Sequence, residues 1–226
     1  MYQTLEPDIV RENDRLYQPM LERAATAVSK DVAPDVISRF RAFIPNASER
    51  CSPSRKPDGG KLLVVGHGDL WSPNVMFRRR VTDGHDLELR FIDFQECMVT
   101  RPSTDLACLV MNSVLPKDRE EHLQAWLKLY HDELTRFLLK FGHDCKEVYT
   151  LDDLWQDYRA GIGHGFMWGV CNAVSMLSSK DLASSMTGTD TEPTRLQHRE
   201  DYSDIQVIAH QRIVSLIKEA AQYGLF

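Results

Sequence analysis

The chain has 226 residues, enough for one large domain or two small ones with a substantial hydrophobic core. Hydrophobic residues make up 42% and charged residues 27%, which is the ordinary balance of a soluble globular protein. The net charge of −6 argues against nucleic acid or an anionic membrane as the main partner, and no apolar run approaches the roughly 18 residues that a transmembrane helix needs. We therefore expect no nucleic-acid partner and no membrane partner.

The first sixty residues predict two helices and then a loop. Apolar residues recur at helical spacing over residues 5–29, and again over 36–43 until Pro45 interrupts the pattern. Residues 46–60 are rich in Ser, Pro, Asp and Gly, a composition that predicts an exposed loop.

A short β-rich part follows this loop. Residues 62–65 are all apolar and predict a buried strand. Segments 74–77 and 87–92 predict the two strands of a hairpin, because the Asp-Gly pair at 83–84 is a turn signal.

Helical patterns dominate the rest of the chain. We expect Ser103 or Thr104 to cap the first of these helices and Pro116 to open the second, which ends before Gly142. The last predicted helix covers residues 205–221.

A third helix is predicted between the helix that ends before Gly142 and the last helix. Thr150-x-x-Asp153 resembles a capping box and predicts its start, and the apolar pattern continues to about residue 177. Its glycines at 161, 163, 165 and 169 cost roughly 1 kcal/mol each relative to alanine. Either another helix or an acceptor substrate comes close to them. Residues 178–197 are polar, and we expect them to be mobile.

The cysteines and the first residues bear on the cellular compartment. The five cysteines are scattered and lack C-x-x-C spacing, so neither a disulfide framework nor a zinc site is expected. Residues 1–11 carry acids and no apolar signal core, unlike a secretory leader. We expect a cytoplasmic protein.

A polar motif lies between the predicted strand and the hairpin. It reads HGDLWSPN at 67–74 and continues beyond the hairpin as FIDFQ at 91–95. An Asp, then an Asn, then a second Asp is the order of the catalytic and metal-binding loops of kinase-like phosphotransferases. Asp69 suits the base that receives the hydroxyl proton. The hairpin can bring Asn74 and Asp93 together as oxygen ligands for Mg²⁺.

Each of these residues also has an ordinary structural interpretation. A lone Asp after a strand, such as Asp69, is usually a turn or cap residue, and Asn74 could equally be a turn residue. His67 is more often a satisfied core or loop histidine than a catalyst. Asp105 could be a first-turn helix residue favoured by the helix dipole. The combination in this order is what points to phosphoryl transfer.

Three stretches together resemble the ecdysteroid kinase-like (CHK kinase-like) family, which is grouped with the choline kinases and aminoglycoside phosphotransferases. They are residues 66–77, 92–95 and 101–106. The resemblance implies that Asp69 is the catalytic base and that Asn74 and Asp93 hold Mg²⁺. It also implies that His67 and Asp105 support the loop geometry.

The resemblance further implies the cofactors and the acceptor. ATP and Mg²⁺ would be the cofactors, and a small-molecule alcohol such as an ecdysteroid would be the substrate, with choline or another amino alcohol as the alternative. A protein substrate is not expected, because Gly68 stands where protein kinases place an Arg and Gln95 stands in place of the Gly of D-F-G.

The implied fold is α+β and protein-kinase-like, consisting mainly of the helical C-terminal lobe with a small catalytic hairpin. We expect one lobe over 1–226, with lead-in helices and a loop (1–60), a catalytic and metal-binding core (61–110) and a helical subdomain (111–226). We expect this chain to lack the N-terminal β-lobe that carries a strand Lys and a helix Glu in such kinases. The chain would then be a truncated kinase or, alternatively, a pseudokinase that binds a ligand or partner.

Overall fold

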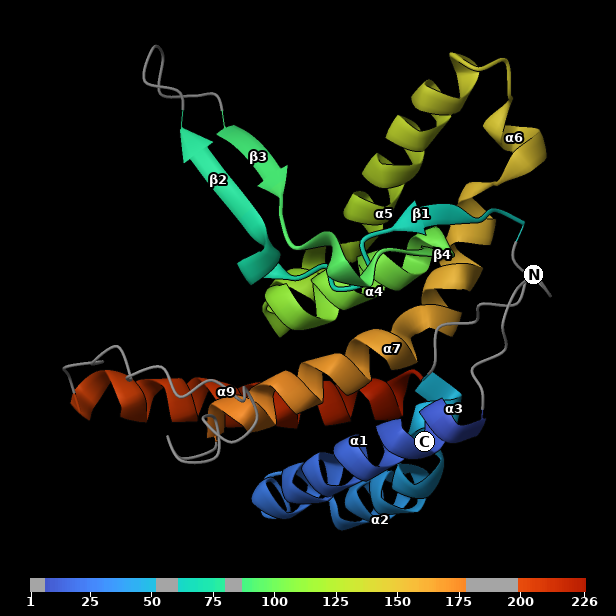
Figure 1. Cartoon of the computed structure of the whole chain (residues 1–226). Coiled ribbons are helices and arrows are strands. Elements are labelled where there is room, and N and C mark those ends of the chain that lie inside the picture. The colour runs from blue at the N-terminus through green and yellow to red at the C-terminus, as the bar shows by residue number, and fades with distance from the viewer. Residues whose placement is uncertain (1–6, 52–60, 80–86, 178–198) are drawn as a thin grey trace. The chain divides into compact units, whose positions relative to one another are not determined.

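The computed structural model describes residues 7–51, 61–79, 87–177 and 199–226 (Figure 1). Helices dominate this part of the chain, and two small antiparallel sheets accompany them, so the predicted α+β class is confirmed. The chain divides into two compact units, here called the sheet unit (Cys51–Phe166) and the helical unit (Leu5–Arg50 with Met167–Phe226). The prediction of a single lobe over 1–226 stays a prediction.

One sheet of the sheet unit joins β1 (Val64–Gly66) to β4 (Met98–Thr100). The strand predicted at 62–65 therefore begins two residues later and ends one residue later than expected. The expectation that it is buried was wrong, because Val65 in the middle of β1 is 78% exposed. Side chains on a strand point alternately to opposite faces, and only one face of this small sheet contacts the core.

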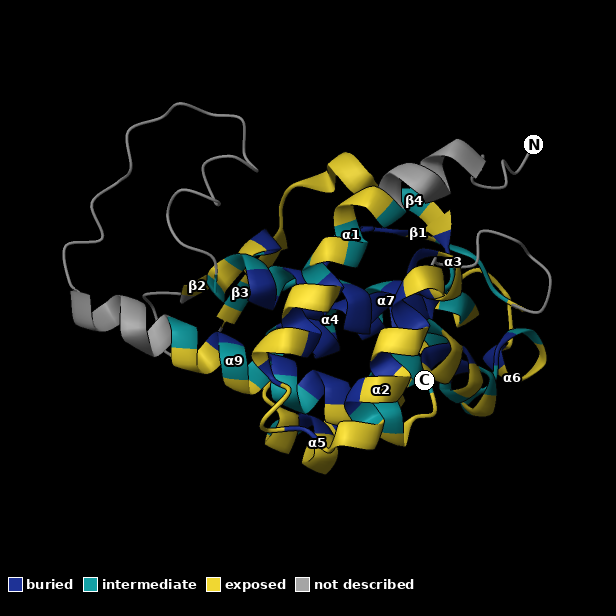
Figure 2. Cartoon of the chain, turned by 90° about the horizontal axis from the view of Figure 1, so that it is seen from below, coloured by how far each residue is buried: buried dark blue, intermediate teal, exposed yellow. Residues whose placement is uncertain are grey.

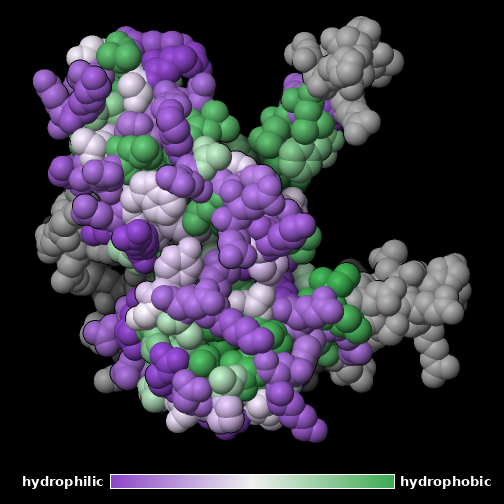
Figure 3. All heavy atoms as spheres, turned by 180° about the vertical axis from the view of Figure 1, so that it is seen from behind, coloured by the Kyte–Doolittle hydropathy of each residue, from purple (hydrophilic) through white to green (hydrophobic). Residues whose placement is uncertain are grey.

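The other sheet is the predicted hairpin. β2 (Val75–Arg79) and β3 (Leu87–Phe91) are antiparallel, with Val75 opposite Phe91, so the hairpin is confirmed. The predicted turn at 83–84 lies outside the described residues. The pairing puts four exposed apolar side chains on one face, which forms the green projection beside the grey atoms in Figure 3: Phe77, Leu87, Leu89 and Phe91.

Four helices complete the described part of the sheet unit. They are α4 (Pro102–Ser113), α5 (Pro116–Leu139), the short α6 (Cys145–Val148) and the first part of α7 (Leu151–Leu177). Pro116 opens α5 as predicted, whereas α6 was not predicted. Figure 2 shows buried residues along α4 and α7. The core of this unit contains Ala107, Cys108, Val110, Met111, Leu123, Leu127, Leu154, Tyr158, Ile162 and Phe166.

The start of α4 differs from the expectation that Ser103 or Thr104 caps it. The helix begins at Pro102, which fits its first turn because that position needs no N–H donor. The Thr104 hydroxyl instead lies 2.8 Å from the Thr100 hydroxyl on β4, in a buried hydrogen bond. This bond joins α4 to the β1–β4 sheet.

Two of the glycines in α7 are explained by close packing on α4. A Cβ atom at Gly161 would lie 3.2 Å from Ser103 Oγ, and one at Gly165 would lie 2.4 Å from the carbonyl oxygen of Ala107. Larger residues at these positions would push the helices apart. Helix packing, rather than contact with a substrate, therefore accounts for these two glycines.

The helical unit contains the first and last helices. α1 (Pro7–Ala27), α2 (Pro34–Phe43) and α9 (Arg199–Gln222) confirm the three helices that the apolar spacing predicts. The loop prediction for 46–60 was partly wrong. Ala47 and Cys51, one turn apart, are both buried on the short helix α3 (Ala47–Cys51).

The last residues of the chain pack into the helical unit. The Phe226 ring lies 5.2 Å from the Phe40 ring and 5.5 Å from the Phe43 ring, measured between centroids. The rest of loop 46–60 and the segment 178–197, which we expected to be mobile, fall outside the described residues. Within the described ranges, no helix is long and apolar enough to cross a membrane.

Candidate functional site

The loop from His67 to Asn74, here called the catalytic loop, connects β1 to β2. Asn74 is buried at its end, and its Nδ2 donates to Asp69 Oδ2 at 3.0 Å and to the Asp69 carbonyl oxygen at 2.8 Å. The structure therefore brings these two predicted site residues into contact. Because the amide nitrogen bonds to Asp69, the amide oxygen is the atom of Asn74 that can bind a cation.

Asp105, in the first turn of α4, holds the beginning of the catalytic loop. Its Oδ2 accepts the main-chain N–H of His67 at 2.6 Å, and its Oδ1 accepts that of Gly68 at 2.9 Å. Hydrogen bonds to a charged acceptor are stronger than those between neutral groups. This carboxylate therefore fixes the position of the backbone that leads to Asp69.

His67 joins the catalytic loop to the segment after the hairpin. Its Nε2 lies 2.8 Å from the carbonyl oxygen of Ile92, and its Nδ1 lies 3.4 Å from the main-chain nitrogen of Asp69. A carbonyl can only accept and an N–H can only donate, so the tautomer with its proton on Nε2 satisfies both contacts. The ring is buried and engaged on both sides, which agrees with a supporting role.

The segment Ile92–Cys97, here called the metal loop, follows β3. Asp93 is exposed and adopts a left-handed backbone conformation (φ 64°, ψ 61°) at the start of a 3₁₀ turn. The main-chain N–H of Ile92 donates to the carbonyl oxygen of Asn74 at 3.0 Å. Asp93 therefore follows the residue that hydrogen-bonds to Asn74, and the expected closeness of the two side chains stays a prediction.

Glycine is required where the two loops touch. Gly68 has a φ of +84°, and a Cβ atom there would lie 2.0 Å from the carbonyl oxygen of Glu96 in the metal loop. An L-residue would be strained by the conformation and would also clash with fixed backbone. Gly68 thus allows the catalytic and metal loops to lie against each other.

The oxygen ligands of these loops fit Mg²⁺ better than a transition metal. Mg²⁺ usually keeps several waters and binds protein through only one or two carboxylates, so the Asn74 amide oxygen and the Asp93 carboxylate suffice as protein ligands. In the part of the chain that the structure describes, no group of three or more His, Cys, Asp or Glu residues is arranged to hold a metal ion.

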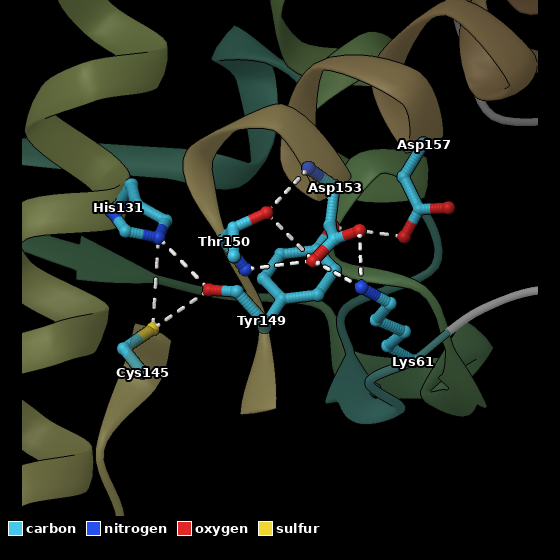
Figure 4. A network of polar contacts seen from close by, with 7 residues as sticks. All are labelled: Lys61, His131, Cys145, Tyr149, Thr150, Asp153 and Asp157. Atoms are coloured by element: carbon cyan, nitrogen blue, oxygen red, sulfur yellow. Dashed lines mark hydrogen bonds and ion pairs between the residues drawn. The ribbon is translucent and has the colours of Figure 1, made fainter. Parts of the chain in front are cut away.

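A network of polar side chains lies at the start of α7 (Figure 4). The predicted capping box is confirmed: Thr150 N–H donates to Asp153 Oδ2 at 2.8 Å, and Asp153 N–H donates to Thr150 Oγ1 at 3.1 Å. Lys61, just before β1, lies 2.9 Å from Asp153 Oδ1. The bonds from Thr150 and Lys61 lower the pKa of Asp153 to about 2.

A second carboxylate of α7 holds the start of α4. Arg101 Nη1 lies 3.2 Å from Asp157 Oδ1, and the Tyr149 hydroxyl donates to Asp157 Oδ2 at 2.8 Å. Burial, and then the bond to Asp157, raise the pKa of Tyr149. Neither Arg101 nor Asp157 was predicted to matter, because a contact between residues so far apart in the chain leaves no local sequence pattern.

His164 on α7 is a further buried residue that the sequence did not single out. Burial lowers its pKa to about 4, and the charge of Asp105 acts in the opposite direction. The imidazole is thus neutral at neutral pH and lies near the carboxylate that holds the catalytic loop.

Comparison with known proteins gives a family but no individual relative. A model of the Ecdysteroid kinase-like family matches residues 2–143, a span that includes Asp69, Asn74, Asp93 and Asp105. No curated protein and no solved structure matches the chain. Because the family model matches more than half of the sequence, the chain belongs to the ecdysteroid kinase-like family.

Proposed function

We propose that this protein is an ATP-dependent phosphotransferase that acts on a hydroxyl group of a small molecule. Its family implies a kinase-like fold and suggests phosphoryl transfer. The observation that carries the proposal is the hydrogen bond between Asp69 and Asn74. The Asn74 carbonyl oxygen also accepts a hydrogen bond from Ile92, the first residue of the metal loop.

In this proposal, the Asp69 carboxylate receives the proton of the acceptor hydroxyl. Asn74 Nδ2 orients the Asp69 carboxylate, while Asp105 and His67 keep the loop backbone in place. A positioned base of this kind typically contributes about 10²–10⁴-fold to the rate. Most of the remaining acceleration in phosphoryl transfer comes from alignment of the reactants.

Asn74 and Asp93 are the residues that would hold Mg²⁺. Bound Mg²⁺ would supply positive charge that offsets the negative charge of the ATP phosphates. The exposure of Asp93 leaves its carboxylate accessible to a ligand that arrives with the nucleotide.

The short path from the metal loop to α4 favours a small-molecule acceptor. Between Asp93 and Pro102 the chain forms only a 3₁₀ turn (Phe94–Glu96) and β4, which is paired with β1. There is no room in this span for the long activation segment with which protein kinases bind their substrates. Within this class, steroid hydroxyls such as those of ecdysteroids are the first acceptors to test, followed by choline and other amino alcohols.

The proposal is tested by binding and by turnover. At a Mg-ATP concentration of 100 times Kd, the wild-type protein should gain about 2.7 kcal/mol of stability. Asp93→Asn should lose most of this gain. Asp69→Asn should keep it but transfer phosphate about 10²–10⁴ times more slowly to any acceptor that the wild type uses.

Asp132→Asn on the exposed face of α5 is the matched control for the loss of a carboxylate, since Asp132 only pairs with Lys128 on the surface. Equal stabilisation of the wild type and Asp93→Asn by Mg-ATP would overturn the metal assignment. Binding of Mg-ATP without phosphate transfer to any of the steroid or amino-alcohol acceptors would favour the non-catalytic alternative.

A further inference from the structure

One side of α4 presents hydrogen-bond acceptors to the backbone of the catalytic loop. Asp105 accepts the N–H groups of His67 and Gly68, as described above. One further position on the same helix, Ser113, contacts the part of the loop on the far side of Asp69. Neither the sequence motif nor the family match assigns a role to it.

Ser113, the last residue of α4, holds the second half of the loop. Its Oγ accepts the main-chain N–H of Ser72 at 2.7 Å. Ser72 begins the 3₁₀ turn Ser72–Asn74, which ends at the residue that contacts Asp69. The bond therefore fixes the start of the turn that delivers the Asn74 side chain.

Cys108 lies on α4 between Asp105 and Ser113, and it is only 2% exposed. Burial, and then the nearby charges of Asp69 and Asp105, raise the pKa of its thiol to about 12, while the main-chain N–H of Leu70 acts in the opposite direction. The thiol is therefore protonated and unsuited to be a nucleophile, but it can still accept a weak hydrogen bond.

Asn112 ties this part of α4 to α7. Its Nδ2 donates to the carbonyl oxygen of Cys108 at 2.8 Å, lies 3.6 Å from the Cys108 sulfur, and is 3.4 Å from the carbonyl oxygen of Gly165. The close packing of Gly165 against Ala107 holds the same two helices together. The acceptors on α4 are thus presented from a fixed backbone.

We propose that Ser113 is a positioning residue for the catalytic loop. It binds the main-chain N–H group of Ser72, while Asp105 binds those of His67 and Gly68, so that α4 holds the loop on both sides of Asp69. The effect on turnover rests on the function proposed above, whereas the effect on loop geometry does not.

Ser113 gives a clean test because it lies at the end of its helix and is only partly buried. In Ser113→Ala, the Ser72 amide should exchange its hydrogen about tenfold faster, since its hydrogen bond is lost. Ser113→Thr retains a hydroxyl and should restore slow exchange. Ser175→Ala is the matched control, because the Ser175 hydroxyl bonds to Cys171 O in its own helix.

Turnover separates positioning from general destabilisation. If an acceptor is phosphorylated, Ser113→Ala should lower kcat about three- to tenfold with the KM for ATP unchanged, and Ser113→Thr should restore it. Unchanged exchange at Ser72 in Ser113→Ala would overturn the proposal. Faster exchange in a protein that phosphorylates no acceptor would support the positioning role while the proposed enzymatic function fails.

Discussion

The two loops of the candidate site are built in different ways. The catalytic loop is held by α4, and both His67 and Asn74 at its ends are buried. In the metal loop, by contrast, every residue from Ile92 to Cys97 is exposed. In the proposed mechanism, the fold thus fixes the position of the base Asp69, while Asp93, the proposed metal ligand, is exposed to an arriving nucleotide and cation. The two loops contact each other at Gly68, at His67 and through the hydrogen bond from the Ile92 N–H to the Asn74 carbonyl oxygen.

The largest expected effect comes from a change that forces the loops apart. Gly68→Ala should lower the free energy of unfolding by about 3–5 kcal/mol, because the new methyl group meets the Glu96 carbonyl and the left-handed backbone is strained. Denaturant unfolding measures this loss. Gly142→Ala is the control, since Gly142 is also left-handed but a Cβ atom there would contact nothing within 4 Å. It should cost only about 1–2 kcal/mol. Equal losses in the two variants would mean that the loops do not touch.

The stability of the protein should depend on pH through His164, the buried α7 residue near Asp105. Its folded-state pKa of about 4 lies below the usual value of 6.5. The unfolded chain therefore binds the extra proton between these values, and stability should fall as the pH is lowered from 6.5 to about 4. The expected loss is on the order of 3 kcal/mol at full effect.

Unfolding experiments across this pH range should be compared with His164→Gln, which carries no titrating group at this position. The variant should lose clearly less stability than the wild type over the same window. Identical slopes for the two proteins would show that another group is responsible for the change.

A smaller loss of stability is expected when the polar network at the start of α7 is disrupted. Asp153→Ala should cost about 1–2 kcal/mol at pH 7, because it removes the capping box and the ion pair with Lys61. Since the folded-state pKa of Asp153 is about 2, its contribution is present above about pH 4 and is lost as the pH falls towards 2. Asp152→Ala, at the exposed neighbouring position, should cost less than about 0.5 kcal/mol. Similar losses in the two variants would contradict the capping role.

Local patterns in the sequence predicted much of this architecture. The hairpin, the start of α5 at Pro116 and the Thr150–Asp153 box each depend on residues close together in the chain, and each is present. Asp69 and Asn74 were predicted to belong to one site, but the hydrogen bond between them was not predicted.

The unpredicted features depend on residues that are distant in sequence. The pairing of Arg101 with Asp157 follows from how α4 and α7 pack, and no local pattern announces it. Ser113 binds a main-chain group of the catalytic loop, so the identity of the residue it contacts carries no complementary signal. The start of α4 was misplaced because Pro102 competed with two good capping residues.

The smallest stability change is expected in the metal loop itself. Asp93→Asn should change the free energy of unfolding by less than about 0.5 kcal/mol without ligand, because the residue is exposed and Asn tolerates the left-handed conformation that Asp93 adopts. Asn74→Ala, in the catalytic loop, should cost about 1–3 kcal/mol, since it leaves two oxygens of the partly buried Asp69 without their donor. Parallel denaturant unfolding of the two variants measures the difference. A loss in Asp93→Asn as large as that in Asn74→Ala would mean that the metal loop is held as firmly as the catalytic loop.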